Sequence, residues 1–241
     1  MARSLGHKGR FTLAYLLLGA AVGAALGAFI VLVQRPGPKP PVPWSTWKPA
    51  DASVGETARA IASHVGGAYK LPDGTQLARV MLGPTRSAGS IEAVALADRA
   101  NAVTLYDPSR TVVYTLCGTQ QNCGLQGAET RASSDALRRE ALELALYTMK
   151  YANAADVAIF FPPPQGATRS TDVLNFPRDD FGRQLDKPLK VTLPHAAAVS
   201  RGKIDSREAG TVDALTSGHQ YRYAVQTATG GRRVLVLQPA A

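Results

Sequence analysis

The longest apolar run in the chain extends from Phe11 to Val33 and contains no charged residue. A helix needs roughly 20 apolar residues to cross a hydrocarbon core of about 30 Å, so this run is long enough to span a membrane. The chain after it mixes polar and apolar residues as globular proteins do. The pattern therefore predicts a tail at 1–10, a transmembrane signal anchor at 11–33, a linker at 34–51 and one folded domain at 52–241.

Cleaved signal peptides have a shorter apolar core, of about 7–15 residues, followed by small residues at the cleavage site. Here the run ends in bulky residues, from Phe29 to Val33, which favours an anchor that stays uncleaved. Arg3, Lys8 and Arg10 precede the run without an acidic residue, which favours a cytoplasmic N-terminus. Basic residues also follow the run, so the charges alone do not decide the orientation. The shortness of the tail and the downstream cysteine pair also favour a cytoplasmic N-terminus. We expect a single-pass protein of the cell membrane with an extracytoplasmic C-terminal domain.

Gly19, Gly23 and Gly27 recur at every fourth position of the apolar run. This spacing places them on one face of a helix, where small residues let a second helix approach closely. The stripe predicts a helix-packing surface for a homodimer or for another envelope protein. Alternatively, a chain rich in alanine and glycine produces such spacing without any function.

The segment from Arg35 to Pro49 is rich in proline, which lacks an N–H and fixes φ. We expect an extended spacer of ~3.1 Å per residue. Trp44 and Trp47 within it would lie either among lipid headgroups or against the domain, and we favour packing on the domain. The formal net charge of +9 favours a position near anionic lipid or anionic wall polymer. The sequence has no basic block, aromatic RNA-binding platform or zinc-ligand spacing, so we expect no nucleic-acid partner, no metal and no cofactor.

Two segments of the domain have the composition and periodicity of helices. Ser53 and Glu56 form a capping-box pattern, which begins a helix that we expect to end near Val65. The second predicted helix, Ser134 to Tyr151, is rich in Ala, Leu, Glu and Arg. Its periodicity places an apolar side toward the core and the following residues toward solvent: Arg139, Glu140, Glu143 and Lys150.

Two pairs of β-forming runs flank turn sequences. Val103–Tyr106 and Thr111–Leu116 enclose a turn that contains Pro108, which predicts a hairpin. Gln220–Thr227 and Arg233–Leu237 enclose two glycines and predict a C-terminal hairpin.

Further strand candidates are Leu77–Leu82, Ile91–Leu96 and Asp156–Phe161, whereas residues 165–206 show no strong period. Together these elements predict an α+β domain with a mixed or antiparallel sheet and two main helices.

Cys117 and Cys123 are the only cysteines and flank a short polar sequence that turns easily. An even cysteine count outside the cytoplasm predicts a disulfide between them. Closing so short a loop removes chain entropy worth ~2–3 kcal/mol. A metal site would need further ligands at suitable spacing, and no histidine lies near these cysteines.

The string Tyr114-Thr115-Leu116-Cys117, together with the anchor, the spacer and the β-rich domain, distantly resembles the sortase transpeptidases. The resemblance implies Cys117 as a nucleophile, His64 as an acid/base and Arg131 as an oxyanion stabiliser. The family's Thr-Leu-x-Thr-Cys pattern is not met, because Leu116 directly precedes the cysteine. A thiol transpeptidase is therefore the alternative function.

Other residues with chemical potential are isolated in the sequence. His195 and His219 have the context of loop histidines, and the acidic pair Asp179-Asp180 that of a solvated surface. The S-x-x-K match beginning at Ser200 lacks the companion motifs of its enzyme class. Arg138 falls on the apolar side of its helix, where it can extend past the helix end or pair with a carboxylate or a ligand anion.

The segment Tyr114–Pro164, which contains YTLCGTQQNCGLQG and LRREALELALYTMKY, resembles uncharacterised single-pass membrane proteins of high-GC Gram-positive bacteria. The resemblance implies a membrane topology and a cell-envelope setting, and it implies no activity. Since the sequence holds no coherent catalytic set, we expect a non-enzymatic interaction or assembly module of the envelope.

Overall fold

The computed structural model describes residues 7–34, 42–71, 73–84, 91–98, 102–118, 120, 123–125, 131–162, 172–194, 204–228 and 230–240. The chain divides into two compact units, Met1–Val42 and Pro43–Ala241. In the first unit the described residues form a single helix, α1 (His7–Gln34). A stretch of α1, Ala14–Val31, has a mean hydropathy of 2.2 and no part of it is buried. By length and composition α1 could cross a membrane.

The predicted glycine stripe lies on α1. A Cβ added at Gly19, Gly23 or Gly27 would meet no atom within 4 Å, so this face of the helix has room for a neighbour. The structure holds no second helix against it among the described residues, and the packing surface stays a prediction.

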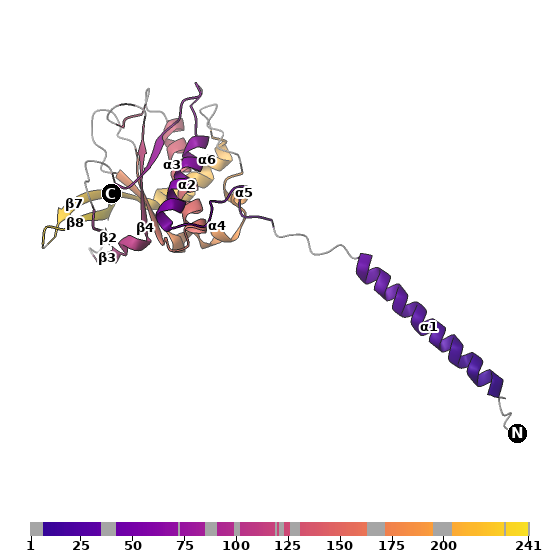
Figure 1. Ribbon diagram of the computed structural model, residues 1–241. Coiled ribbons are helices and arrows are strands. Elements are labelled where there is room, and N and C mark those ends of the chain that lie inside the picture. The colour runs from indigo at the N-terminus through magenta and orange to yellow at the C-terminus, as the bar shows by residue number, and fades with distance from the viewer. Residues whose placement is uncertain are drawn as a thin grey trace. The chain divides into compact units, whose positions relative to one another are not determined.

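The second unit is built on one mixed sheet of eight strands (Figure 1). In chain order the strands are β1 (Arg79–Leu82), β2 (Ala93–Ala97), β3 (Val103–Tyr106), β4 (Thr111–Cys117), β5 (Val157–Phe161), β6 (Asp172–Pro177), β7 (Gln220–Thr227) and β8 (Arg233–Pro239). Their order across the sheet is β1-β4-β5-β6-β7-β8-β2-β3. The pairs β4–β5 and β2–β8 are parallel, and the other neighbours are antiparallel. The α+β class is confirmed, and of the two predicted sheet types the mixed one is present.

Three longer helices are present among the described residues of this unit, not the two that the sequence indicates. They are α2 (Val54–Ala68), α3 (Arg131–Tyr151) and α6 (Ser206–Thr216); shorter segments are α4 (Gly182–Asp186), α5 (Leu189–Thr192), η1 (Pro108–Arg110), η2 (Arg178–Phe181) and η4 (Ser217–His219). The capping box is confirmed, since the Ser53 hydroxyl accepts from the Glu56 N–H and the Glu56 carboxylate accepts from the Ser53 N–H. Asp205 caps α6 by accepting from the N–H groups of Arg207 and Glu208.

One predicted hairpin is wrong and the other is confirmed. β7 and β8 form the C-terminal hairpin, joined in an antiparallel register. β3 and β4 are not partners: β3 pairs with β2, whereas β4 lies between β1 and β5. Because most of β4 is buried, it needs neighbours on both sides, and the intervening η1 carries the chain from one part of the sheet to another. The β-forming residues identify the strands but not their partners.

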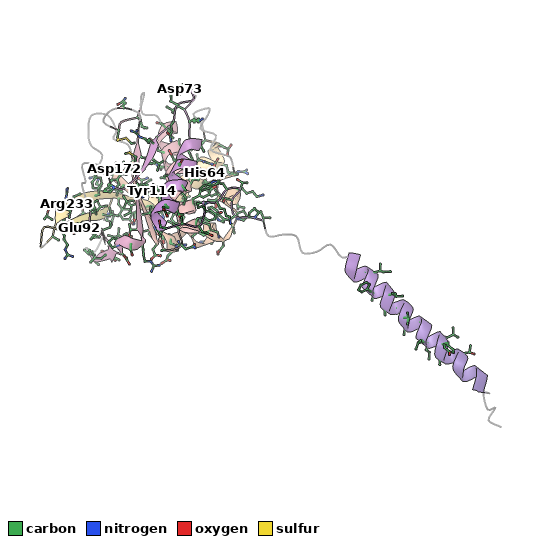
Figure 2. All side chains as sticks on the ribbon, in the orientation of Figure 1. His64, Asp73, Glu92, Tyr114, Asp172 and Arg233 are labelled. Carbon is green, nitrogen blue, oxygen red and sulfur yellow. A yellow bond between two sulfur atoms is a disulfide. The ribbon has the colours of Figure 1, made fainter. Side chains whose placement is uncertain are left out.

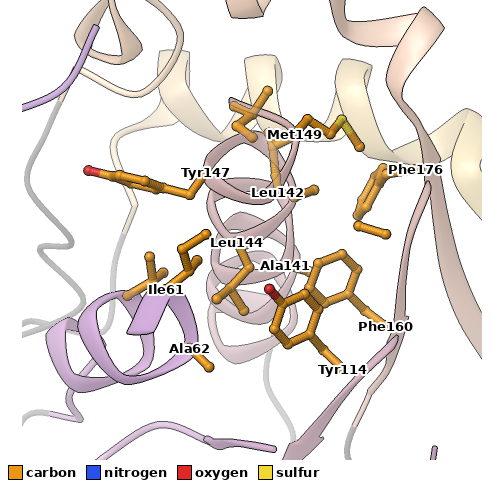
Figure 3. Packing of buried hydrophobic residues seen from close by; sticks show 14 of the residues in the cluster. Ile61, Ala62, Tyr114, Ala141, Leu142, Leu144, Tyr147, Met149, Phe160 and Phe176 are labelled. Atoms are coloured by element: carbon orange, nitrogen blue, oxygen red, sulfur yellow. The ribbon is translucent and has the colours of Figure 1, made fainter. Parts of the chain in front are cut away.

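The sheet separates two hydrophobic clusters. The larger fills the space between the helices and one sheet face, where Tyr114 of β4 stacks on Phe160 of β5 with ring centroids 5.1 Å apart and Leu142 and Leu144 of α3 pack nearby (Figure 3). The smaller includes Phe161 of β5 and buried residues of β2, β6 and β8. Since β2 and β5 are separated by β6, β7 and β8, the sheet must curl around this second cluster.

The predicted linker, 34–51, overlaps the folded domain, because the second unit begins at Pro43. Trp44 is buried and makes edge-to-face contacts with Tyr147 and Tyr151 of α3, and Trp47 stacks on His64 of α2. Both tryptophans therefore pack on the domain, as we favoured, and they fix the start of the second unit onto α2 and α3.

Candidate functional site

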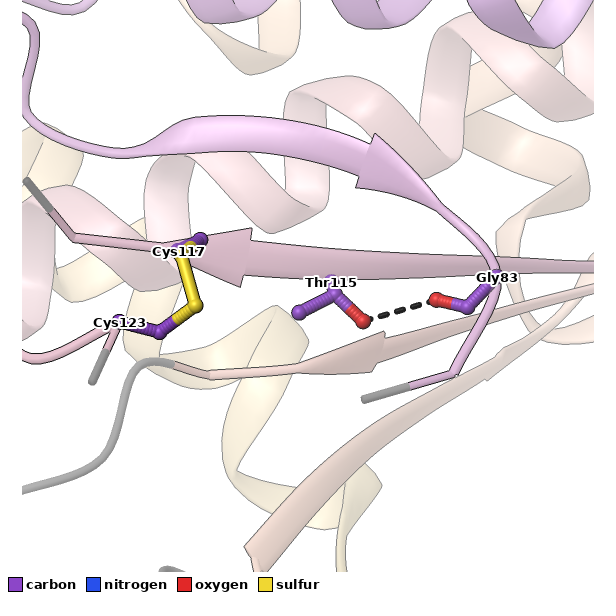
Figure 4. The surroundings of a disulfide bond; sticks show 4 residues. All are labelled: Gly83, Thr115, Cys117 and Cys123. Atoms are coloured by element: carbon purple, nitrogen blue, oxygen red, sulfur yellow. Dashed lines mark hydrogen bonds between the residues drawn. A yellow bond between two sulfur atoms is a disulfide. The ribbon is translucent and has the colours of Figure 1, made fainter. Parts of the chain in front are cut away.

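The predicted disulfide is present between Cys117, at the end of β4, and Cys123 (Figure 4). Cys123 has a left-handed backbone, with φ of 65°, and its carbonyl accepts a 2.8 Å hydrogen bond from the Gly118 N–H. A Cβ at Gly118 would lie 2.0 Å from the Gly124 carbonyl oxygen, so only glycine allows the two segments of the loop to approach so closely. Neither cysteine is free, and the disulfide state has no Cys117 thiolate to act as a nucleophile.

The structure gives the other two residues of the transpeptidase set separate surroundings. His64 lies within α2 (Figure 2). Its ring is stacked on Trp47 and contacts the edge of Tyr147. Burial lowers the pKa of His64, and the negative charge of Glu143 opposes that shift. Arg131 begins α3, and its side chain lies outside the described residues. No contact between His64 and Cys117 is present among the described residues, so the geometry adds nothing in favour of the transpeptidase set.

Several other sequence candidates can be placed. Arg138 donates a 2.8 Å hydrogen bond to the Asp213 carboxylate of α6. Of the alternatives that the sequence leaves open, pairing with a carboxylate is therefore the one present. His195 and the motif at Ser200 lie outside the described residues. Asp180 has an exposed side chain, as predicted, but its Oδ2 lies 3.9 Å from the Nδ1 of His219.

The predicted solvent-facing side of α3 is wrong at its centre. The Arg139 side chain is 2% exposed, Glu140 is fully buried, and Glu143 is mostly buried. The helix is enclosed on that side too, since α2 and α6 both pack against it. A charged residue at an interhelical contact gives the same sequence pattern as a charged residue in water, which is why periodicity alone misplaces it.

Arg139 is the centre of a buried polar cluster that joins three helices. Its Nε donates to Glu208 Oε1 of α6 at 2.8 Å, and its Nη1 donates to Glu143 Oε2 at 3.0 Å and to the Tyr69 hydroxyl at the end of α2. The Tyr69 hydroxyl in turn donates to Glu143 at 2.6 Å. Burial disfavours the guanidinium charge, but Tyr69, Glu143 and Glu208 outweigh that effect and raise the pKa of Arg139.

Glu140 stands apart within this cluster. Neither oxygen of its carboxyl has a hydrogen-bond partner among the described residues. Burial raises the pKa of Glu140 well above its ordinary range, and the negative charge of Glu143 acts in the same direction. The cluster thus combines a hydrogen-bonded network around Arg139 with a buried carboxyl group whose pKa is raised.

A second group of polar side chains lies where the curled sheet closes on itself. We call it the rim cluster, and its members are Tyr106, Asn175, Asp180, His219 and Tyr221. The Asn175 Nδ2 donates to the Tyr106 hydroxyl at 3.0 Å, which links β6 to β3 across the interior of the curl. The His219 Nδ1 lies 3.1 Å from the Asn175 carbonyl oxygen and 3.9 Å from Asp180.

The rim cluster is neutral apart from Asp180. Burial raises the pKa values of Tyr106 and Tyr221, and in both cases the Asp180 charge adds to the effect. Burial also lowers the pKa of His219. With a neutral ring, His219 must carry its proton on Nδ1 to donate to the Asn175 carbonyl, which leaves Nε2 as an acceptor.

Asn175 is the residue of this cluster that needs explanation. It is 0% exposed, and its Oδ1 has no partner among the described residues. Whichever way the amide is turned, the Tyr106 hydroxyl contacts one end of it and the other end stays unpartnered. Buried polar groups are nearly always satisfied, so this exception calls for an explanation.

A cavity of about 430 Å³ adjoins the rim cluster. Tyr221 belongs to both, and the residues on either side of His219, Gly218 and Gln220, line the cavity. Leu96 of β2 completes an apolar part of its wall. The rim cluster and this cavity form the candidate binding site.

Sequence reasoning does not find this site. Asn175 lies in residues 165–206, where the pattern is weak, and Tyr106 belongs to a strand that the sequence pairs with β4. Two of its residues, His219 and Asp180, are named as candidates from the sequence. No protein-family model matches the chain, and neither the curated proteins nor the solved structures that were searched contain a match to it.

Proposed function

We propose that the chain is a membrane-anchored, non-enzymatic binding module of the cell envelope. Helix α1 spans the membrane with its N-terminus in the cytoplasm, and the unit from Pro43 to Ala241 lies outside. The length and apolarity of α1 support the anchor, and the Cys117–Cys123 disulfide is typical of an oxidising compartment. The glycine stripe of α1 offers a surface for a second copy or for another envelope protein.

The ligand that best fits the rim cluster is a neutral carbohydrate. Asn175 offers an unpartnered amide end, and the hydroxyls of Tyr106 and Tyr221 can both donate and accept. Such amphoteric groups match sugar hydroxyls, and tyrosine rings suit the apolar faces of a sugar ring. The charged side chains of the site are two carboxylates, the half-exposed Asp180 of the cluster and Asp98 on the cavity wall, so the site does not favour an anionic ligand.

The observation that carries this proposal is the buried, half-satisfied amide of Asn175 in a cluster that shares Tyr221 with a cavity of about 430 Å³. Burying an unpaired polar group costs about 1–3 kcal/mol, which a hydrogen-bonded ligand would recover. A binding site with a few convergent polar groups in a concave, partly apolar wall is the usual form of a small-molecule site.

The test is a titration of the full chain with N-acetylglucosamine, in micelles of a detergent that has no sugar headgroup. We expect a saturable rise in the thermal unfolding midpoint, abolished in Asn175→Leu and weakened in Tyr221→Phe. Tyr223→Phe is the matched control, because Tyr223 lies two residues along the same strand and packs its ring on Phe161. No saturable shift in the unaltered chain would refute carbohydrate binding, and an equal loss in Tyr223→Phe would assign it elsewhere.

Location is tested separately, with a membrane-impermeant maleimide applied to intact cells. Labelling of Cys117 and Cys123 only after a reductant is expected for an outside, disulfide-bonded domain. Labelling that needs cell lysis but no reductant would mean that the topology is inverted, whereas labelling of intact cells without reductant would return the thiol transpeptidase to consideration.

A further inference from the structure

A second cavity, of about 500 Å³, lies between helix α2 and the edge strand β1. The helix contributes Arg59, Ser63 and Gly67, and the strand contributes Arg79 and Val80. The cavity shares no residue with the rim cluster and lies against the opposite edge strand in the sheet order. It therefore calls for an explanation of its own.

The wall of this cavity has two positive charges and no carboxylate. Neither Arg59 nor Arg79 forms a salt bridge with a described residue. Arg59 interacts electrostatically with Glu56, one turn earlier on α2, whose carboxylate already accepts from Ser53. Two like charges that face one cavity repel each other, and an anion bound between them would remove that repulsion.

Helix α2 and strand β1 are in close contact beside the arginines. Gln76 donates its side-chain N–H to the Gly66 carbonyl at 2.9 Å, which fixes the segment before β1 to the end of α2. Gly66 lies so close to β1 that an added Cβ would be 2.7 Å from a methyl group of Val80. The cavity is thus bounded by two elements in direct contact.

Gly67, the next residue, marks the open part of the wall. A Cβ added there would meet nothing within 4 Å. Of two adjacent helical glycines, one makes the contact with β1 and the other leaves space in the cavity. This difference supplies a way to fill the cavity without removing either arginine.

We propose that the cavity between α2 and β1 binds a phosphate group through Arg59 and Arg79. Guanidinium groups recognise phosphate by paired N–H donors, and two of them can hold one phosphodiester or phosphomonoester. The group can belong to the headgroup of an anionic phospholipid or to a phosphate in solution or on a polymer. The chemistry of recognition is the same for both sources.

The test is hydrogen exchange on the full chain, read at the amides of α2 and β1. One arm uses neutral-detergent micelles with inorganic phosphate, compared with chloride at equal ionic strength. The other arm uses lipid nanodiscs of phosphatidylcholine, with and without phosphatidylglycerol. We expect exchange to slow in at least one arm: slowing with inorganic phosphate identifies a phosphate free of the membrane, and slowing only with phosphatidylglycerol identifies the lipid headgroup.

Variants connect the effect to the cavity. Since a charge-assisted hydrogen bond contributes about tenfold or more to affinity, Arg59→Gln and Arg79→Gln are each expected to weaken binding about tenfold. The matched controls are the single variants Arg222→Gln and Arg232→Gln, each of which removes the same charge from an exposed position elsewhere. Gly67→Leu keeps both arginines and fills the space, and we expect it to abolish protection.

Three results would overturn the proposal. The first is the absence of protection at α2 and β1 in both arms. The second is an equal loss in the Arg222 and Arg232 controls, which would indicate attraction by net charge alone. The third is normal binding by Gly67→Leu, which would place the phosphate on the arginine side chains outside the cavity. None of these results depends on carbohydrate binding at the rim cluster, so the two proposals fail separately.

Discussion

Replacing Glu140 by glutamine should change how the stability of the domain depends on pH. Glu140 is fully buried in α3, and its carboxyl oxygens have no partner among the described residues. The titratable groups around it are Glu143 and Arg139 of the same helix, Tyr69 at the end of α2, and Glu208 of α6 through its bond to Arg139. Burial, aided by the charge of Glu143, raises the pKa of Glu140 in the folded protein.

The sign of the effect follows from which state holds the proton. In the unfolded chain a glutamate ionises near pH 4.3, whereas the folded protein keeps the Glu140 proton to a much higher pH. Between these two pKa values the native state binds one more proton, so the free energy of unfolding falls as pH rises, by about 1.4 kcal/mol per pH unit.

Glu140→Gln has almost the same shape and no titration, so it lacks this loss. We expect the difference in unfolding free energy between the variant and the unaltered chain to grow by about 1.4 kcal/mol per pH unit above pH 5. The difference at pH 5 itself is not the test, because the amide introduces its own unpaired groups. The slope isolates Glu140, since shifts at His64 and His219 are common to both proteins and cancel.

The assay is urea unfolding of the full chain in neutral-detergent micelles, followed by tryptophan fluorescence. The chain has two tryptophans, and Trp44 contacts Tyr147 and Tyr151 of α3, so the signal reports the helix that carries Glu140. A constant difference between the two proteins from pH 5 to pH 8 would refute the reasoning. It would mean that Glu140 ionises in the folded state as readily as in the unfolded one.

Three further predictions concern the same domain and the same assay. Gly66→Ala should destabilise the domain by about 1–3 kcal/mol, because the new methyl overlaps Val80. Gly67→Ala should be neutral or stabilise the domain by about 0.4–1 kcal/mol, because its methyl meets no atom. Equal effects of the two substitutions would contradict the packing of Gly66 against Val80. Arg139→Met leaves two carboxylates without their partner, so it should cost about 3–5 kcal/mol, and a loss below 1 kcal/mol would show that water reaches the cluster. Replacing Cys117 and Cys123 by serine should cost ~2–3 kcal/mol, and a reductant should affect the unaltered chain by the same amount while leaving the variant unchanged.

The sequence predicts elements whose signal is local. The capping box at Ser53 and Glu56 is satisfied by groups three residues apart, and the C-terminal hairpin needs only its own turn. The disulfide also joins nearby residues. Each of these structures is determined by a short segment, and each is present.

Elements that depend on distant segments are predicted poorly. The partners of β3 and β4 follow from the order of the whole sheet, which no turn sequence contains. β6 and α6 lie in or next to residues 165–206, where the sequence pattern is weak. β6 is buried between two strands and α6 is held largely by contact with α3, so both depend on distant segments. Asn175 is part of that strand, so the rim cluster depends on the same distant contacts.

The error on α3 has a physical origin that also bears on function. Periodicity assigns charged residues to water, yet Arg139 and Glu140 are both buried, and only Arg139 has its charge fully paired among the described residues. A protein that needed only stability would gain from an apolar residue at position 140, because an unpaired buried carboxyl is costly in either protonation state. Asn175 presents the same conflict on the other side of the sheet. Asn175 belongs to the rim cluster, which meets a cavity through Tyr221, whereas Glu140 is enclosed between helices, so the proposed ligand site involves Asn175 and the pH dependence of stability involves Glu140.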